Sequence, residues 1–194
     1  MITWEELEKI VSNCRRCDLC RTRTNTVLGT GNRESDIMFI GEGPGYHEDM
    51  QGEPFVGAAG KLLDKMFAAI GFSRSDIYIA NTVKCRPPEN RVPLPEEQNA
   101  CIDYLRCQFK LIKPKIIVCL GATAAKEIIR EDFRITKERG IWFDKKGINT
   151  IATYHPSALL RDESKKRPAW EDFKAIRKKY DEIKENESRI ENGK

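Results

Sequence analysis

A loop rich in glycine and proline directly follows an apolar run, and this junction constrains the fold more than any other part of the sequence. Residues 37–40 (IMFI) form the apolar run, and residues 41–45 (GEGPG) and 52–57 (GEPFVG) supply the glycines and prolines. Glycine has no Cβ and proline fixes a turn, so such a strand end suits close approach of the backbone to a ligand. Phe55 lies within this loop, as either a core residue or a stacking surface for a flat ligand.

Two familiar nucleotide-binding signatures do not fit this loop. The dinucleotide fingerprint requires a third glycine five residues after the first, and Tyr46 occupies that position. A phosphate-binding P-loop requires Ser or Thr after Gly-Lys, and Leu62 follows Gly60 and Lys61 instead. Neither phosphate site is therefore indicated.

Apolar runs alternate with helical patterns along most of the chain. The alternation predicts an α/β fold in three layers, a central, mostly parallel four-stranded sheet flanked by helices on both faces. Residues 141–143 and the turn at 144–147 predict an antiparallel edge. Thr3 and Glu6 form a capping-box pattern that predicts a short helix ending near Ser12. The β-like runs cover 36–41, 77–83, 115–120 and 148–154, and the helical patterns between them cover 58–70, 95–112 and 122–130.

Length and composition indicate a single domain over residues 1–194, with a charged C-terminal helix or tail at about 168–194. No apolar stretch approaches the roughly 18 residues of a membrane helix, so we expect a cytoplasmic protein without a membrane partner. The net charge of +4 permits nucleic-acid binding without requiring it. Charged residues make up 33% of the chain, which suggests a thermophilic source.

Seven cysteines in a chain without a secretory leader favour metal binding or reactive thiols over disulfides. Cys14 and Cys17 form a CxxC pair, and Cys85 and Cys101 follow at a distance. Four such cysteines fit either a tetrahedral zinc or a four-iron cluster, and their spacing does not choose between the two. Cys20 forms an equally good pair with Cys17.

The carboxyl ends of the predicted parallel strands should meet at one edge of the sheet, where ligands bind in such folds. The glycine-rich loop, Asn81 and His155 each follow one of these strands. A phenyl ring, an amide, carboxylates and an imidazole are therefore expected to converge on one compact polar pocket with a flat wall. Leu159, Leu160 and Arg161 follow shortly after His155, either as ordinary packing residues or as the wedge and phosphate anchor of proteins that unstack DNA bases.

Taken together, the motifs resemble those of the family 4 uracil-DNA glycosylases, an iron–sulfur branch found in archaea and bacteria. The resemblance extends from Cys14 to about Arg161, nearly the whole chain. The motifs that carry it are Cys14-x-x-Cys17-x-Leu19, residues 41–45, Glu48-Asp49, residues 52–57, residues 81–88 (NTVKCRPP), Cys101 and His155-Pro156-Ser157-x-Leu159.

The resemblance implies a cofactor and a set of partners. It implies a structural [4Fe-4S] cluster on Cys14, Cys17, Cys85 and Cys101, with Cys20 left spare. It also implies a monomer that acts on uracil-containing DNA, single- or double-stranded, in association with the nucleoid. A sliding clamp is a candidate protein partner.

The resemblance also implies roles in base excision. A uracil must leave the duplex before its glycosidic bond is reached. Phe55 would then stack on the flipped base, and Asn81 would read its O4/N3 edge. His155 would stabilise the negative charge that develops on O2 as the bond breaks. Backbone amides at Gly41 and Gly43 would contact the base.

Two glutamates are candidates for the remaining roles. In family 1 enzymes an Asp aligns with Gly43 and a Tyr that bars thymine aligns with Gly45, so both functions need substitutes here. We assign Glu42 to the attacking water or to local geometry and Glu48 to exclusion of thymine, although the reverse assignment stays open. Solvated loop charges are the alternative for both.

Five further residues are expected to hold the DNA. Gly52 and the amides near Ser157 would bind phosphates that flank the flipped base. Leu159 or Leu160 would enter the vacated position in the base stack, and Arg161 would anchor a phosphate.

Three rival interpretations remain. One is a non-enzymatic iron–sulfur or zinc nucleic-acid-binding module, which would have no use for Asn81 together with His155. Another is a related DNA glycosylase with broader base specificity, including the family 5 enzymes, against which Glu42 and Asn81 argue. A third is an electron-transfer protein, disfavoured because no second cofactor motif is present.

Overall fold

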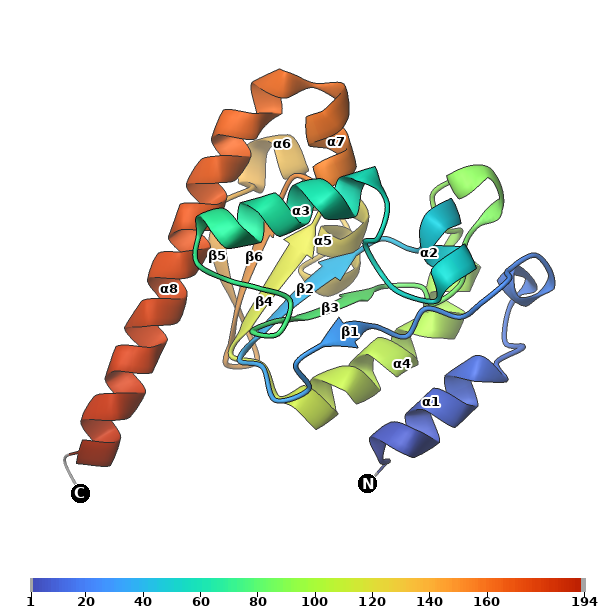
Figure 1. The fold of residues 1–194 in the computed structure, drawn as a ribbon, viewed down its shortest axis with the longest axis horizontal. Helices are drawn as coiled ribbons and strands as arrows, with labels where there is room; N and C mark the ends of the chain where they lie inside the picture. Colours follow the sequence, from blue (N-terminus) through green and yellow to red (C-terminus); the bar gives the residue numbers. More distant parts are fainter. Residues whose placement is uncertain (1, 193–194) are drawn as a thin grey trace.

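A mixed β-sheet forms the centre of the molecule, and helices cover both of its faces (Figure 1). The computed structural model describes residues 2–192, and within them the sheet has six strands in the order β1-β3-β2-β4-β6-β5. The four inner strands are parallel, and β1 and β5 are antiparallel to their neighbours. The strands are β1 (Thr30–Gly31), β2 (Ile37–Gly41), β3 (Tyr78–Asn81), β4 (Ile116–Leu120), β5 (Trp142–Lys145) and β6 (Ile148–Thr153).

The predicted α/β sandwich is confirmed, and the predicted number of strands needs correction. The four parallel strands occur where their apolar runs predict them, and the predicted antiparallel edge is the β5–β6 hairpin. Lys146 and Gly147 form its turn with φ values of 58° and 84°. The short β1, which pairs only Thr30 and Gly31 with β3, is the strand that the sequence did not reveal. Two residues are too few to produce an alternating pattern.

Successive residues of each central strand point to opposite faces, which separates the core into two clusters. Ile37 and Phe39 of β2 face the cluster under α3 and α8, whereas Met38 and Ile40 face the cluster under α4 and α5. The helices are α1 (Trp4–Ser12), α2 (Tyr46–Gln51), α3 (Ala58–Ala69), α4 (Pro95–Ile112), α5 (Ala122–Ile128), α6 (Ile135–Glu138), α7 (Pro156–Arg161) and α8 (Lys166–Asn192), with 3₁₀ turns at Asp18–Arg21, Pro88–Asn90 and Glu163–Lys165.

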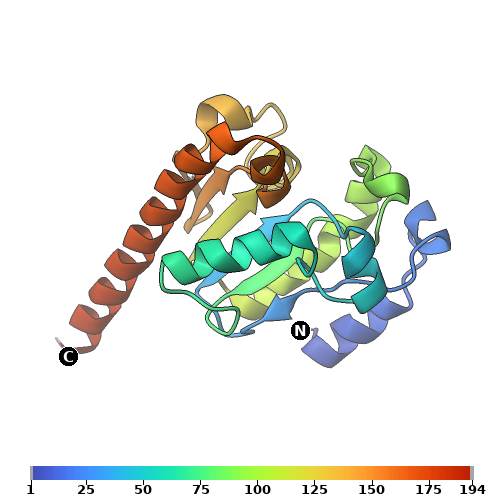
Figure 2. The same ribbon diagram turned by 45° about the horizontal axis from the view of Figure 1, so that its top comes forward.

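The N-terminal segment packs against α4 through a third apolar cluster (Figure 2). Thr3 and Glu6 form the predicted capping box of α1, which buries Leu7 and Val11. The cluster continues through Val83 to the buried Cys85 and Cys101. Burial of this apolar surface holds the CxxC segment beside the loop that follows β3.

The C-terminal helix α8 lies along one side of the sandwich and buries Phe173 and Ile176 in the core. It begins two residues before the predicted boundary of 168, and residues 193 and 194 of that prediction lie outside the described residues. Lys184 of α8 pairs with Asp36, which precedes β2. No described helix has the length and apolar content to cross a membrane.

Candidate active site

A cavity of about 640 Å³ opens at the carboxyl ends of the parallel strands, where β2 and β4 point toward the region between α2 and α7 (Figure 1). The loops after β2, β3, β4 and β6 all line it, in agreement with the expected convergence. Eight of the residues predicted to form the site contribute to its wall: Glu42, Gly43, Glu48, Phe55, Asn81, His155, Ser157 and Arg161.

Phe55 forms one flat wall of the cavity and is at the same time part of the core. Its ring centroid lies 5.5 Å from that of His155, with 32° between the ring planes. Only 5% of the residue is exposed, so the ring is held firmly with one portion turned to the cavity. The core interpretation of Phe55 is confirmed, and stacking on a flat ligand stays a prediction for a ring that also lines the cavity.

Asn81, the last residue of β3, presents an unpaired amide oxygen. The residue is 2% exposed, and its Oδ1 has no hydrogen-bond partner among the described residues. A buried acceptor without a donor costs about 1–3 kcal/mol, so a ligand that supplies a donor relieves that cost. Gly41 leaves room for the amide, since a Cβ there would lie 2.4 Å from Oδ1.

The imidazole of His155 is neutral, with its proton on Nε2. Nδ1 accepts a hydrogen bond from the backbone N–H of Ser157 at 3.2 Å and lies 2.8 Å from Ser157 Oγ. Burial lowers the pKa of His155 to about 4, and the charge of Arg161 acts in the same direction against the opposing effect of Glu48. Since Nδ1 serves as an acceptor, the ring offers Nε2–H as a donor.

Glu42 is fixed at both its backbone and its side chain. Its carbonyl accepts hydrogen bonds from Thr82 Oγ1 at 2.6 Å and from the Val83 N–H at 3.2 Å. Its carboxylate Oε2 accepts a hydrogen bond from Thr123 Oγ1 at 2.5 Å. Sequence reasoning missed Thr123, which lies just after β4. The rule that gathers polar residues at strand ends, applied also to β4, would have identified it.

The carboxylate of Glu48 joins the two glycine-rich segments. Oε2 accepts the N–H of Gly45 at 3.1 Å, and Oε1 accepts those of Val56 and Gly57 at 2.8 and 2.9 Å. Because both oxygens already accept backbone donors, Glu48 is less available to orient a water than Glu42. The amino-acid sequence alone does not predict these hydrogen bonds, because they depend on how the loop folds back.

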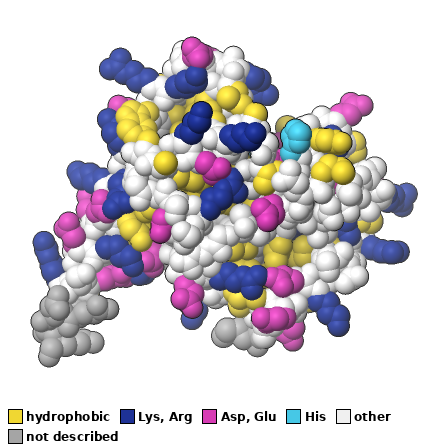
Figure 3. All heavy atoms as spheres, in the orientation of Figure 1, with side chains coloured by type: hydrophobic (Ala, Val, Ile, Leu, Met, Phe, Trp, Pro, Cys, Tyr) yellow, Lys and Arg dark blue, Asp and Glu magenta, His cyan; other side chains and the backbone are white. Residues whose placement is uncertain are grey.

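The predicted DNA-contacting residues differ in their exposure. Leu160 is 50% exposed, whereas Leu159 is 1% exposed and packs in the interior, so Leu160 is the wedge candidate that DNA can reach. Arg161 lines the cavity, and Gly52 ends α2 outside it with a φ of 76°. Figure 3 shows Lys and Arg side chains beside hydrophobic ones over α7 and the start of α8.

The cysteines of the predicted cluster gather around a second, much smaller cavity. Cys14, Cys17, Cys85 and Cys101 all line it, and Cys20 does so too. Arg23 Nη1 donates to the sulfur of Cys85 at 3.0 Å, and the backbone N–H of Lys84 donates to that of Cys101 at 3.2 Å. Such donors stabilise thiolates in clusters.

No three or more His, Cys, Asp or Glu side chains among residues 2–192 are arranged to hold one metal ion, and the cluster that the resemblance implies stays a prediction. Burial raises the pKa of Cys101 to about 11 and also raises the pKa of Cys85, so both are protonated as free thiols. An iron cluster would supply the charge that converts them to thiolates.

A buried lysine connects the cysteine cavity with Asn81. Lys84 is 1% exposed, and its Nζ donates to the carbonyl oxygen of Asn81 at 2.8 Å and to Oε1 of Gln108 at 2.7 Å. The same residue precedes Cys85 and donates its backbone N–H to Cys101. The strand end that carries Asn81 is therefore hydrogen-bonded to the wall of the cysteine cavity.

Comparisons with known proteins agree on one family. The family model described as "Uracil DNA glycosylase superfamily" matches residues 28–174. The type-4 uracil-DNA glycosylase of Archaeoglobus fulgidus is 45% identical over 184 residues, which cover 91% of this chain and 92% of that protein. That of Thermotoga maritima is 49% identical over 170 residues, covering 84% and 88%. The type-5 enzyme of Pyrobaculum aerophilum is 30% identical, covering 66% and 64%.

Proposed function

Since this chain belongs to the uracil-DNA glycosylase superfamily and resembles its type-4 members over most of its length, it is a DNA glycosylase that hydrolyses N-glycosidic bonds, and we propose that its cavity selects uracil. The observation that carries this proposal is the unpaired Oδ1 of Asn81 at the cavity wall. Uracil offers an N3–H donor to that oxygen and an O4 acceptor to the amide nitrogen. Cytosine reverses both groups and would leave each unpaired, at about 1–3 kcal/mol apiece.

The base enters this cavity only after it leaves the DNA stack. Phe55 stacks on the extruded ring, an interaction worth about 1–3 kcal/mol per base. The backbone of Gly41 lies beside the amide of Asn81 and that of Gly43 lines the cavity, and both contact the base through their N–H groups. A mispaired uracil is easier to extrude, which favours excision from U:G pairs.

His155 and Glu42 divide the chemistry between them. The Nε2–H of the neutral His155 donates to O2 of uracil, where negative charge grows as the bond to deoxyribose breaks. Glu42, oriented by Thr123, positions the water that attacks the sugar. The hydrogen bond from His155 to O2 is strongest at the transition state, because the negative charge on O2 is largest there.

Glu48 shapes the pocket and keeps out thymine. Its three backbone hydrogen bonds hold residues 45, 56 and 57 together at the edge of the cavity. The family 1 tyrosine that bars the thymine methyl is replaced here by Gly45, and the neighbouring Glu48 carboxylate fills part of that space.

The DNA strands are held around the cavity by the residues of α7 and by Gly52. Leu160 enters the position that the uracil leaves, and Arg161 binds an adjacent phosphate. The amides near Ser157 and Gly52 hold the phosphates on either side. Residues 1–194 act as one domain, since both apolar clusters share the same sheet.

Cys14, Cys17, Cys85 and Cys101 would hold a [4Fe-4S] cluster. Its role is structural, because hydrolysis of a glycosidic bond transfers no electron. The cluster would join the N-terminal segment to the loop after β3 and so stabilise the surface beside the cavity.

Release of free uracil from DNA tests the proposed function. The protein is incubated with single-stranded and U:G duplex oligonucleotides, and the abasic strand is then cut with alkali. We expect uracil release by the wild-type chain, a loss of at least 100-fold in Asn81→Ala, and near-normal activity in Asn149→Ala, a change at the other end of the sheet. Undiminished uracil release by Asn81→Ala would contradict the assignment.

A further inference from the structure

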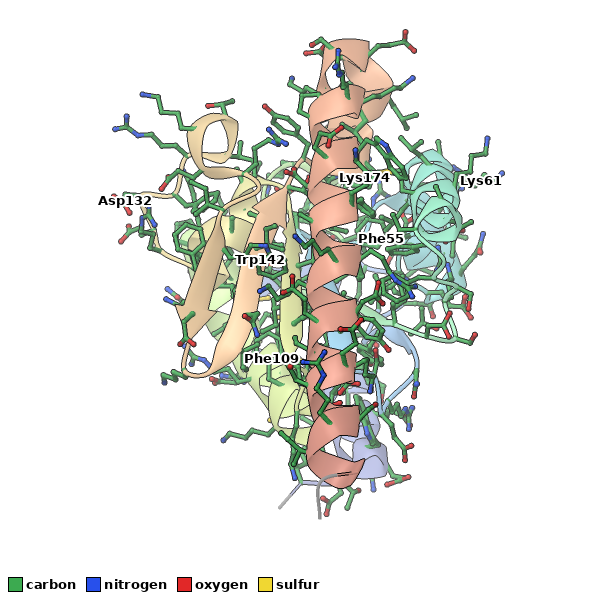
Figure 4. The ribbon with its side chains drawn as sticks, turned by 90° about the vertical axis from the view of Figure 1, so that its left-hand side faces the viewer. Phe55, Lys61, Phe109, Asp132, Trp142 and Lys174 are labelled. Carbon is green, nitrogen blue, oxygen red and sulfur yellow. The ribbon has the colours of Figure 1, made fainter. Side chains whose placement is uncertain are left out.

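The backbone of Phe55 adopts a conformation that aromatic residues rarely take. Its φ is 56°, in the left-handed region, where a bulky side chain is strained. Such strain persists only where the surrounding structure imposes it, and it concentrates at functional sites. Figure 4 shows Phe55 on the same side of the sheet as α3, which begins only three residues after it.

Two elements hold this strained backbone. Gly60 of α3 lies so close that a Cβ there would sit 1.7 Å from the Phe55 carbonyl oxygen. Arg74, in the loop between α3 and β3, donates through Nη1 to the Pro54 carbonyl at 3.0 Å and through Nη2 to the Phe55 carbonyl. Its Nε donates to Asp64 of α3 at 2.7 Å, which fixes the guanidinium itself.

Arg74 acts from behind the cavity, which it does not line. Its side chain is 30% exposed on the other side of the loop. A planar guanidinium that binds two consecutive carbonyl oxygens fixes the peptide planes on both sides of the Phe55 Cα. These planes determine the direction in which the phenyl ring leaves the backbone.

We propose that Arg74 is a positioning residue that sets the stacking geometry of Phe55 and thereby the strength with which the extruded base is held. The inference rests on the proposed function of the cavity. Without the guanidinium, the backbone of Phe55 can relax toward extended φ values, and the ring then turns away from its 5.5 Å approach to His155.

A purely structural role for Arg74 makes a different prediction, and Arg177 supplies the matched control. Arg177 of α8 also donates to two consecutive carbonyls, those of Ile70 and Gly71, each at 3.2 Å, and it pairs with Asp181. It does not line the cavity. If Arg74 only secured the loop, both replacements would act alike.

The test compares the affinity of the full-length protein for two DNA strands. One strand contains 2′-fluoro-2′-deoxyuridine, whose fluorine slows bond cleavage, and the other contains a tetrahydrofuran abasic site. We divide the dissociation constant for the abasic strand by that for the fluorinated strand. This ratio isolates the contribution of the base to affinity. Arg74→Ala should lower this ratio about 5- to 20-fold, within the range of a lost stacking interaction. Arg177→Ala should leave it unchanged even where its melting temperature falls.

A double-mutant cycle with Phe55→Ala identifies the route of the effect. In that background Arg74→Ala should lower the ratio no further, because there is no ring left to position. Arg74→Lys, which keeps the charge but on a single donor nitrogen, should give an intermediate ratio, and it decides the matter if Arg74→Ala does not fold. The inference would be overturned if Arg74→Lys and Arg74→Ala both kept the wild-type ratio. It would also be overturned if Arg74→Ala changed the ratio equally in the wild-type and Phe55→Ala backgrounds. Either result would leave uracil excision in place. A wild-type chain that released no uracil would overturn the proposed function and this inference with it.

Discussion

Thr123 Oγ1 donates a 2.5 Å hydrogen bond to Oε2 of Glu42, and this bond joins the first turn of α5 to the loop after β2 inside the cavity. A hydrogen bond to a charged group contributes about 1.5–3 kcal/mol, so the hydroxyl fixes the direction of the carboxylate. The function assigned to Glu42 therefore depends on a neighbour from a different element.

Replacement of Thr123 by Val should remove this bond with little change in shape. We expect kcat for uracil release to fall about tenfold or more while KM changes little, because the water loses its orientation after the base is bound. Thr136→Val, at another position on the cavity wall, is the control and should keep kcat. A lower kcat and a higher KM in both variants would point to general damage of the pocket.

Acidification should destabilise the protein through His155. The native pKa of about 4 lies below the unfolded value of about 6.5, so the unfolded chain binds an additional proton between these values. Stability attributable to this group is complete above pH 6.5 and is lost as the pH falls toward 4. His155→Gln should show a smaller decline in melting temperature over pH 6.5–4 than the wild type. A His155→Gln curve parallel to the wild-type curve would show that His155 is not the group responsible.

Two adjacent leucines should respond in opposite ways to replacement by alanine. Leu159→Ala creates a cavity in the interior and should lower the free energy of unfolding by about 2–5 kcal/mol, measured by denaturant titration. Leu160→Ala should leave stability nearly unchanged but slow uracil release from duplex DNA more than from single strands. Equal slowing on both DNA forms would remove Leu160 from its role in the base stack.

Loss of one proposed cluster ligand should affect colour and stability together. Cys101→Ala should yield protein that lacks visible absorbance and bound iron and sulfide, and that melts at a lower temperature than the wild type. Cys20→Ser is the comparison, because the resemblance leaves Cys20 outside the ligand set, and it should keep all three properties. Normal iron content in Cys101→Ala would contradict its assignment.

The sequence predicted the parallel strands accurately because their apolar runs are buried on both faces. Ile37 and Met38 illustrate this, since they enter opposite core clusters and leave no polar position in the run. The carboxyl ends of these strands place Asn81 and His155 at the predicted edge of the sheet. Local pattern and sheet geometry together were therefore enough to identify the cavity.

The sequence could not reveal contacts made by residues whose type is common on surfaces. Arg74 and Thr123 follow unremarkable patterns, and only the folded chain places them against Phe55 and Glu42. Leu159 and its exposed neighbour are equally apolar, so their difference depends on the rotation of α7. The hydrogen bonds of Glu48 were equally unpredictable, because the loop that carries Val56 and Gly57 folds back onto it.

The position of Lys84 has a consequence for attempts to alter this protein. Its ammonium supports the peptide of Asn81, and its own amide reaches the sulfur of Cys101. Asn81, to which we assign the reading of the base, is thus linked through Lys84 by hydrogen bonds to the sulfur of Cys101. Anyone who shifts Asn81 to admit a different nucleobase will also have to rebuild the packing around that sulfur.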